Sequence, residues 1–165
     1  MLEIIKSRRS IRCFKKQAVE STVLHTIIGA GTWAPSGLNN QPWKFIIIRD
    51  RAMREKLAGL TKYGSIICGA PVCIAVFLDS SLSYDRTKDV QAIGACIQNM
   101  LLQTHALGLG AVWLGEILRN GATVRALLKV PVTMEFMALI ALGYPAEENA
   151  VSERKKTEEV ILCEL

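Results

Sequence analysis

The densest group of side chains able to do chemistry lies near the start of the chain, in Arg8-Arg9-Ser10-Ile11-Arg12. Guanidinium groups present paired N–H donors that match phosphate oxygens, and the serine hydroxyl adds another donor. The first twenty residues carry six Lys and Arg against two Glu, a local charge of +4 in a chain of net charge +5. This concentration predicts a localised anionic partner such as a phosphate monoester. A solvated basic face or a nonspecific nucleic-acid patch is the alternative.

A second polar group fills the segment Ala34-Pro35-Ser36-Gly37-Leu38-Asn39-Asn40-Gln41-Pro42-Trp43. Its Pro, Ser, Gly and Asn residues are turn formers, so a plain connector is one interpretation. However, the three successive carboxamides offer a dense set of donors and acceptors. Such a set suits recognition of the edge of a flat heterocycle.

Two further segments are less specific. Glycines flank a short apolar run in Gly108-Leu109-Gly110-Ala111-Val112-Trp113-Leu114-Gly115 and would let backbone N–H groups approach a ligand, although such glycines are also common for structural reasons. The run lacks the context of a dinucleotide fingerprint and is not a P-loop. Gly143-Tyr144-Pro145, followed by Arg154-Lys155-Lys156, indicates by itself only a basic loop.

The chain offers no catalytic machinery of its own. The sequence shows no Ser/His/Asp set, no paired catalytic carboxylates and no cluster of metal ligands. Its two histidines, His25 and His105, fall in predicted helices without companion ligands, so both are interpreted as structural. The five cysteines are an odd number and form no C-x-x-C pair, which argues against a disulfide framework or a zinc site. Each cysteine is interpreted as a small buried hydrophobic residue of a protein in the reducing cytoplasm. An enzyme of this kind needs a cofactor that carries the reactivity.

Composition indicates one domain over residues 1–165. Half the residues are apolar and no repeat of fixed period occurs. The first residues offer no apolar stretch for a secretory signal, and the most apolar segment, Val90 to Leu102, is too short and too polar to span a bilayer. We therefore expect a cytoplasmic protein without a membrane partner.

The elements that must position these groups alternate between helical and extended periods. Apolar residues recur at helical spacing over Leu2–Ser7 and Ser21–Ala30. Two more helices are predicted from their N-caps. Asp50 is expected to cap a helix that ends near Gly59, and Asn120 is expected to cap a helix that ends at Leu128. The longest helix is predicted over Asp89–Leu107, stopped by Gly108, and is apolar nearly all round, which is typical of a core or subunit interface. Strands are predicted over 44–48, 72–78, 111–114 and 136–142, with an extended terminal arm over 160–165. This pattern predicts an α/β or α+β sandwich.

In this order, the segments resemble the nitroreductase family of flavin-dependent oxidoreductases. The resemblance rests on the Arg-Arg-Ser-Ile-Arg start, the Pro-Ser-Gly-Leu-Asn-Asn-Gln-Pro-Trp loop, Trp113-Leu114-Gly115, Leu142-Gly143-Tyr144-Pro145 and the Glu158-Glu159-Val160 tail. It implies an α+β, three-layer sandwich with a central, mainly antiparallel sheet flanked by helices, and a homodimer that exchanges its C-terminal arm. It also implies one FMN at each of two interface sites. NADH or NADPH would reduce this FMN, and nitroaromatics, quinones or similar acceptors would oxidise it by ping-pong turnover.

The resemblance also assigns site residues. Arg8, Arg9 and Ser10 would hold the FMN phosphate and ribityl chain, and Arg12 would lie near the pyrimidine end of the ring. The partner chain would contribute Pro35, Ser36, Gly37 and Asn39, with Gln41 close by. Trp113, Leu114 and Gly115 would lie along the ring, with a backbone N–H reaching N5. Arg154 and Lys155 would return to the phosphate, although Lys156 stands where the family often has proline.

Three other functions remain open at this point. A flavin-binding storage or sensor protein would hold FMN without turnover, and dehalogenation, azoline oxidation or flavin breakdown would use the same FMN frame. A nucleic-acid module would need basic residues spread over a face with stacking aromatics, whereas aromatics make up only 6% of this chain and its charge is focused. The short stretch from Asp79 to Asp89 leaves no room for the inserted helices that shape the acceptor pocket in longer members, so the resemblance does not name the acceptor.

Overall fold

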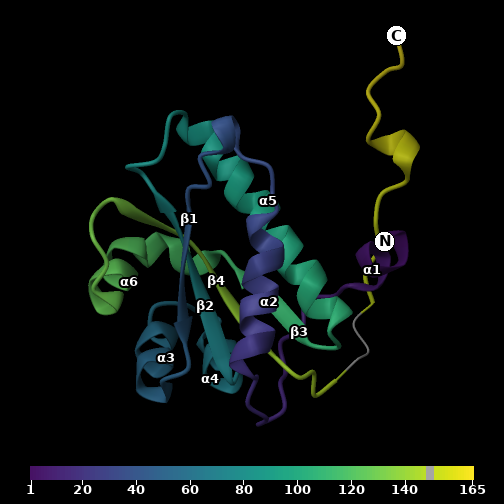
Figure 1. The fold of residues 1–165 in the computed structure, drawn as a ribbon. Coiled ribbons are helices and arrows are strands. Elements are labelled where there is room, and N and C mark those ends of the chain that lie inside the picture. Colours follow the sequence, from purple (N-terminus) through teal and green to yellow (C-terminus); the bar gives the residue numbers. More distant parts are fainter. Residues whose placement is uncertain (148–150) are drawn as a thin grey trace.

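The central layer is a four-stranded sheet in the order β1-β2-β4-β3, in which every neighbouring pair is antiparallel (Figure 1). The structure, a computed structural model, describes residues 1–147 and 151–165. The strands are β1 (Trp43–Ile48), β2 (Val72–Asp79), β3 (Gly110–Leu114) and β4 (Met134–Gly143). All four predicted strands are confirmed, and β1 and β3 form the two edges of the sheet.

Helices cover both faces of this sheet. Two long helices lie on one face, α2 (Ser21–Thr32) and α5 (Arg86–Ala106). Three short ones lie on the other, α3 (Arg51–Ala58), α4 (Gly64–Gly69) and α6 (Gly121–Leu128). The first helix, α1 (Leu2–Ser7), contacts α5. The three layers confirm the α+β sandwich.

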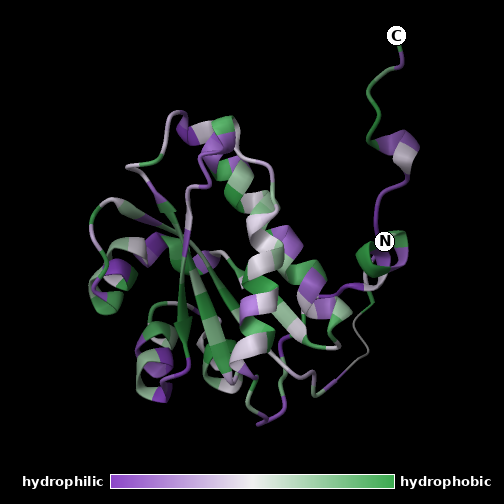
Figure 2. Ribbon diagram, viewed as in Figure 1, coloured by the Kyte–Doolittle hydropathy of each residue, from purple (hydrophilic) through white to green (hydrophobic). Residues whose placement is uncertain are grey.

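Strand β2 shows why the sheet needs cover on both sides. Its residues are buried along its whole length, with Val72, Ile74 and Val76 facing α2 and α5. The alternate residues, such as Phe77, belong to the second core beneath α3, α4 and α6. A strand buried on both faces has a continuous apolar sequence, and the apolar central strands are visible in Figure 2.

Helix α5 begins three residues earlier than predicted. The carboxylate of Asp85 accepts a hydrogen bond from the backbone N–H of Lys88 at 3.0 Å, so Asp85 is the N-cap and Asp89 lies inside the first turn. The predicted stop is confirmed, since Gly108 has φ +74°. Only one face of α5 is buried, because Gln91 and Gln98 are exposed, so the prediction of a helix apolar nearly all round was too broad.

Of the other predicted helix starts and helices, some are confirmed and others are not. Asp50 caps α3 as expected, accepting from the backbone N–H of Met53 at 2.7 Å. Asn120 stands at the N-cap position of α6 as expected, but its side chain makes no capping hydrogen bond; its amide Nδ2 donates instead to the carbonyl of Leu60 at 2.7 Å. Helix α4, only six residues long, was not predicted.

The cysteines fall into two classes. Cys73 and Cys96 are buried, and burial raises the pKa of each thiol to about 12. Cys13, Cys68 and Cys163 are exposed, so the interpretation of every cysteine as a buried hydrophobe was wrong for these three.

The C-terminal segment extends away from the sheet and the helices that cover it (Figure 1). Residues 151–165 are exposed and contain one short helix, η3 (Thr157–Glu159). In the described part of the chain, no helix is both long and apolar enough to cross a bilayer.

Candidate active site

The N-terminal arginine segment lies along the free edge of β3. Ser10 forms a parallel bridge with Ala111, and the backbone N–H of Ile11 donates to the Ala111 carbonyl at 3.0 Å. Glycine is required opposite this segment, because a Cβ at Gly110 would lie 2.6 Å from the Cβ of Ile11. Two of the predicted groups, residues 8–12 and 113–115, therefore share one edge of the sheet.

Three guanidinium groups gather at the start of this edge. Arg8 is partly buried, and its buried Nε has no hydrogen-bond partner within the described residues. The pKa of the Arg8 guanidinium is lowered, first by burial and then by the positive charges of Arg154 and Arg9. Arg154, from the far end of the chain, is therefore close enough to Arg8 for its charge to act on it. Like charges held together in this way favour an anion as their ligand.

The strand end beside this cluster is open. Trp113 is 41% exposed and its ring lies toward α5, since a Cβ at Gly94 would be 4.0 Å from the ring edge. Leu114 points the other way and is buried. At Gly115 an added Cβ would meet nothing within 4 Å, so a flat ligand can approach the backbone there.

The loop over residues 35–41 is attached to the other end of α5. The amide Nδ2 of Asn40 donates to Asp89 Oδ1 at 2.7 Å and to the Leu82 carbonyl at 3.1 Å. Ser83 Oγ donates to Asp89 Oδ2 at 2.6 Å. Burial acts to raise the pKa of the fully buried Asp89 carboxyl, but the hydrogen bonds from Ser83 and Asn40 outweigh it and lower this pKa.

This loop holds an unusual backbone conformation. Leu38, Asn39 and Gln41 have φ of 53°, 55° and 46°, which is uncommon for residues other than glycine. The backbone N–H of Gln41 donates to Ser36 Oγ at 3.1 Å, and a Cβ at Gly37 would lie 2.2 Å from the Tyr84 hydroxyl. Such conformations persist only where surrounding contacts fix them, and they cluster at functional sites.

The loop and the arginine segment of one chain lie at opposite ends of α5. Asp89 holds the loop near the helix start, whereas Ser7 and His105 bond at 2.8 Å near the helix end. The intervening helix is about 24 Å long at 1.5 Å per residue. The structure therefore brings the predicted residues together in two groups. One contains Arg8, Arg9, Ser10, Arg12, Trp113, Leu114, Gly115 and Arg154, with exposed Lys155 next in sequence; the other contains Pro35, Ser36, Gly37, Asn39 and Gln41.

Comparison with known proteins identifies the family of the chain. The profile of the Nitroreductase family matches residues 5–63 and 59–144. The chain belongs to the nitroreductase family. A Methanothermobacter thermautotrophicus protein assigned as an NADH dehydrogenase/NAD(P)H nitroreductase is 40% identical over 149 residues, covering 89% of this chain and 78% of that protein.

Solved nitroreductase structures are also similar. A Desulfovibrio desulfuricans protein assigned as a nitroreductase, solved in complex with FMN, is 48% identical with a TM-score of 0.95, covering 99% of this chain and 96% of that one. A Clostridium acetobutylicum protein assigned as an NADH oxidase is 31% identical with a TM-score of 0.88, covering 98% of this chain and 99% of that one.

The Asn40–Asp89–Ser83 network was not predicted from the sequence. Asn40 belonged to the carboxamide run, but Asp89 was interpreted only as the start of a helix. Replacement of Asp89 by alanine removes the acceptor of the partly buried Ser83 hydroxyl and one of the two acceptors of the Asn40 amide, so we expect the free energy of unfolding to fall by about 2–4 kcal/mol. Because the folded-state pKa is lowered, this contribution is present above the ordinary carboxyl pKa and is lost as the pH falls through the folded value.

Urea denaturation of the Asp89→Ala variant measures this loss. Asp89→Asn is the matched control, because its amide oxygen still accepts one of the two hydrogen bonds, and it should lose less stability. Equal stability of Asp89→Ala and the wild type would show that the network does not fix the loop.

Proposed function

We propose that this chain is an FMN-dependent NAD(P)H oxidoreductase, acting as one FMN-binding domain over residues 1–165 in a homodimer with two shared sites. The observation that carries the proposal is the cluster of Arg8, Arg9 and Arg154, in which the buried Nε of Arg8 has no hydrogen-bond partner in the described ranges 1–147 and 151–165. A phosphate monoester supplies the missing charge and acceptors. The FMN-bound relative at 48% identity supports FMN as the ligand that carries this phosphate.

The residues fit an extended flavin nucleotide along the β3 edge. Arg8, Arg9, Ser10, Arg154 and Lys155 would hold the phosphate and ribityl chain. The ring would then lie over Trp113, Leu114 and Gly115, where the open backbone at Gly115 can donate to N5. Arg12, exposed beside Ser10, would lie at the pyrimidine end of the ring.

A second copy is needed to complete this site. The loop carrying Pro35, Ser36, Gly37, Asn39 and Gln41 lies about 24 Å along α5 from the arginine end of its own chain. A two-fold dimer can place the loop of each chain over the β3 edge of its partner. The strained backbone of the loop would then present its carboxamides to the ring in a fixed orientation.

Bound FMN supplies hydride transfer chemistry at N5. The chain contributes binding, orientation and charge: the arginine cluster anchors the phosphate, and the positive charge of Arg12 favours the reduced ring. Because NAD(P)H and the acceptor would use the same exposed face in turn, turnover is ping-pong. Nitroaromatics, quinones and similar small molecules are the proposed acceptors.

Absorbance and steady-state kinetics of the purified protein test this function. We expect a yellow protein that releases FMN rather than FAD on denaturation and oxidises NADH or NADPH with a nitroaromatic or quinone acceptor. Double-reciprocal plots at several acceptor concentrations should be parallel. Intersecting lines would reject ping-pong turnover, and bound FMN without any turnover would instead indicate a storage or sensor protein.

Two arginine variants should lose different properties. Arg8→Ala removes a phosphate donor and should weaken FMN binding by about 1.5–3 kcal/mol, the usual range for a hydrogen bond to a charged group. Arg12→Ala should mainly lower the flavin reduction potential. Fluorescence titration of the apoprotein and equilibration with reference dyes measure these effects, with Lys56→Ala on α3 as the control. Wild-type affinity in Arg8→Ala, or an unchanged potential in Arg12→Ala, would contradict the respective assignment.

A further inference from the structure

A pocket of about 280 Å³ lies between the loop over residues 35–41 and the first turns of α5. Tyr84, Lys88 and Gln91 line it with polar side chains, beside the backbone of Gly37 and the methyl group of Ala92. The three polar side chains belong to neither of the two groups that would bind FMN.

Tyr84 packs directly on the backbone of this loop. A Cβ at Gly37 would collide with the hydroxyl and the ring edge of Tyr84, so only glycine leaves room for the ring there. The short helix η1 (Gly37–Asn39) also contacts α5, and the two lie side by side in Figure 1. The pocket is therefore a fixed part of the loop and would accompany it to the flavin of a partner chain.

Lys88 brings a positive charge to the pocket. Its Nζ lies 5.0 Å from the centre of the Tyr84 ring, which is a cation–π contact, and it forms no ion pair with any acidic group of the described chain. The carboxylate of Asp85 accepts from the backbone N–H of Lys88. Both oxygens of the buried Asp89 accept hydrogen bonds from neighbouring side chains. Because these carboxylates are engaged elsewhere, the ammonium group is available to an oxyanion.

Two more donors line the same pocket. The hydroxyl of Tyr84 and the amide of Gln91 make no hydrogen bond within residues 1–147 and 151–165. With the ammonium group of Lys88 they can all donate to a carboxylate, beside the small apolar side chains of Ala92 and Ala95. Pockets for drug-sized ligands measure about 300–1,000 Å³, so this one suits a single ring with an anionic group rather than a dinucleotide.

We propose that Tyr84 and Lys88 bind the carboxylate of a one-ring aromatic electron acceptor, so that the site favours anionic acceptors over neutral ones. In the two-fold dimer, the loop of one chain lies over the β3 edge of its partner, and the pocket beside the loop then opens next to the exposed face of the partner's flavin. The segment between β2 and α5 thus determines acceptor specificity. This inference rests on the proposed function and names the substrate class of the same site.

Two acceptors of matched shape test the proposal. 4-Nitrobenzoate and 4-nitrobenzamide differ little in size, but only the first is an anion at neutral pH. In the FMN-loaded protein, the ratio of kcat/KM for the benzoate to kcat/KM for the benzamide should fall roughly tenfold on Lys88→Gln, because one charge-assisted hydrogen bond is lost at an exposed site. Lys88→Arg keeps the charge and should keep most of the ratio. Comparing ratios cancels the intrinsic reactivity of the two acceptors and any difference in FMN content.

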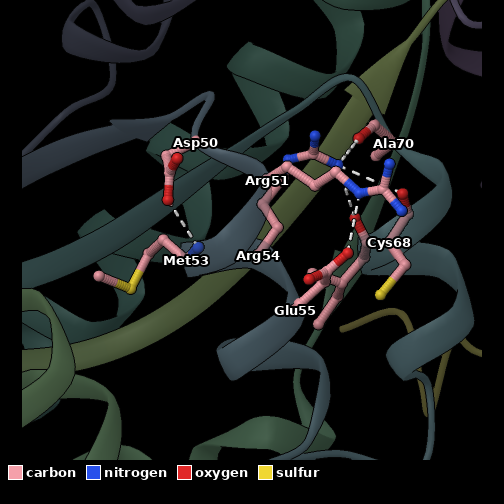
Figure 3. Close-up of polar contacts among 8 residues, drawn as sticks. Asp50, Arg51, Met53, Arg54, Glu55, Cys68 and Ala70 are labelled. Carbon is pink, nitrogen blue, oxygen red and sulfur yellow. Dashed lines mark hydrogen bonds and ion pairs between the residues drawn. The ribbon is translucent and has the colours of Figure 1, made fainter.

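A hydroxyl variant and a charge control accompany this measurement. Tyr84→Phe keeps the ring beside Lys88 and removes one neutral donor, so the ratio should fall by about threefold. Arg51→Gln is the control for a lost surface charge. Arg51 lies on α3, on the other face of the sheet, and pairs there with Glu55 at 2.8 Å (Figure 3), so its ratio should equal that of the wild type.

Two results would overturn the proposal. One is a ratio in Lys88→Gln equal to that of the wild type. The other is an unchanged ratio together with a KM for NADPH that rises relative to the KM for NADH, because the lysine would then bind a phosphate of the electron donor.

Benzoate provides a measurement that does not need turnover. It has the same carboxylate but no nitro group to be reduced. In the FMN-loaded protein, benzoate should slow the chemical acetylation of Lys88, followed by mass spectrometry, whereas benzamide at the same concentration should not. Equal acetylation of Lys88 with both compounds would contradict the carboxylate site.

These outcomes separate the inference from the proposed function. Turnover of both acceptors with the same ratio in every variant contradicts only the role of Lys88 and Tyr84. An FMN-loaded protein that reduces neither acceptor contradicts the proposed oxidoreductase, and the protection of Lys88 by benzoate still decides whether the pocket binds a carboxylate.

Discussion

Two variants that each bind FMN poorly should form a mixed dimer with one working site. One chain carries Arg8→Ala with Arg12→Ala, and the other carries Ser36→Ala with Asn39→Ala. In the mixed dimer, both damaged groups meet in one site, and the intact arginines and loop meet in the other. We expect each parental dimer to be nearly empty, whereas the purified mixed dimer holds about one FMN and recovers about half the wild-type rate per dimer.

The physical reason is the separation of the two groups along α5. Within one chain, the loop is held at Asp89 and the arginine segment at His105, about 24 Å apart, so we expect each to complete a site with the partner chain. Chains with different affinity tags allow the mixed dimer to be purified and its flavin absorbance measured. A mixed dimer of two differently tagged Arg8→Ala/Arg12→Ala chains is the control and should stay empty. If the complementary pair is equally empty while folded and dimeric, the loop and the arginines serve the same chain's site.

Riboflavin should bind much more weakly than FMN. Without the phosphate, the chain loses the charge-assisted bonds from the cluster around Arg8, and two such bonds at about 1.5–3 kcal/mol each correspond to roughly a hundred- to ten-thousandfold in affinity. High salt should reduce the difference, because it screens the positive charges of Arg8, Arg9 and Arg154.

Fluorescence titration of the apoprotein with both flavins, at low and high ionic strength, measures this effect. The ratio of the two affinities should shrink in Arg8→Ala and stay at the wild-type value in Lys56→Ala. Equal affinities in the wild type would indicate a site that recognises only the ring, and the basic segment would then return to its interpretation as a nucleic-acid patch.

Local patterns in the sequence were sufficient for the sheet and for several helix ends. Continuous apolar runs such as residues 72–78 form strands because both faces of the sheet are covered. Asp50 begins α3 through a hydrogen bond to a residue close in sequence, and Gly108 ends α5 through its own backbone conformation. Both roles can therefore be recognised without knowledge of the fold. Two contacts account for the differences. The Asp85 carboxylate accepts from the backbone N–H of Lys88 and starts α5 before the predicted Asp89, and the Asn120 amide donates to a carbonyl sixty residues away.

The sequence by itself also determined which residue types could recognise a phosphate and a flat ring, and their order was enough to indicate the family. What only the tertiary structure decided is which of these groups meet. Arg154 approaches Arg8 and the segment at Ser10 joins Ala111 through contacts between residues far apart in the chain, which no local period encodes. The length and direction of α5 separate the loop from the arginines, because a rigid helix fixes the distance between whatever its two ends hold.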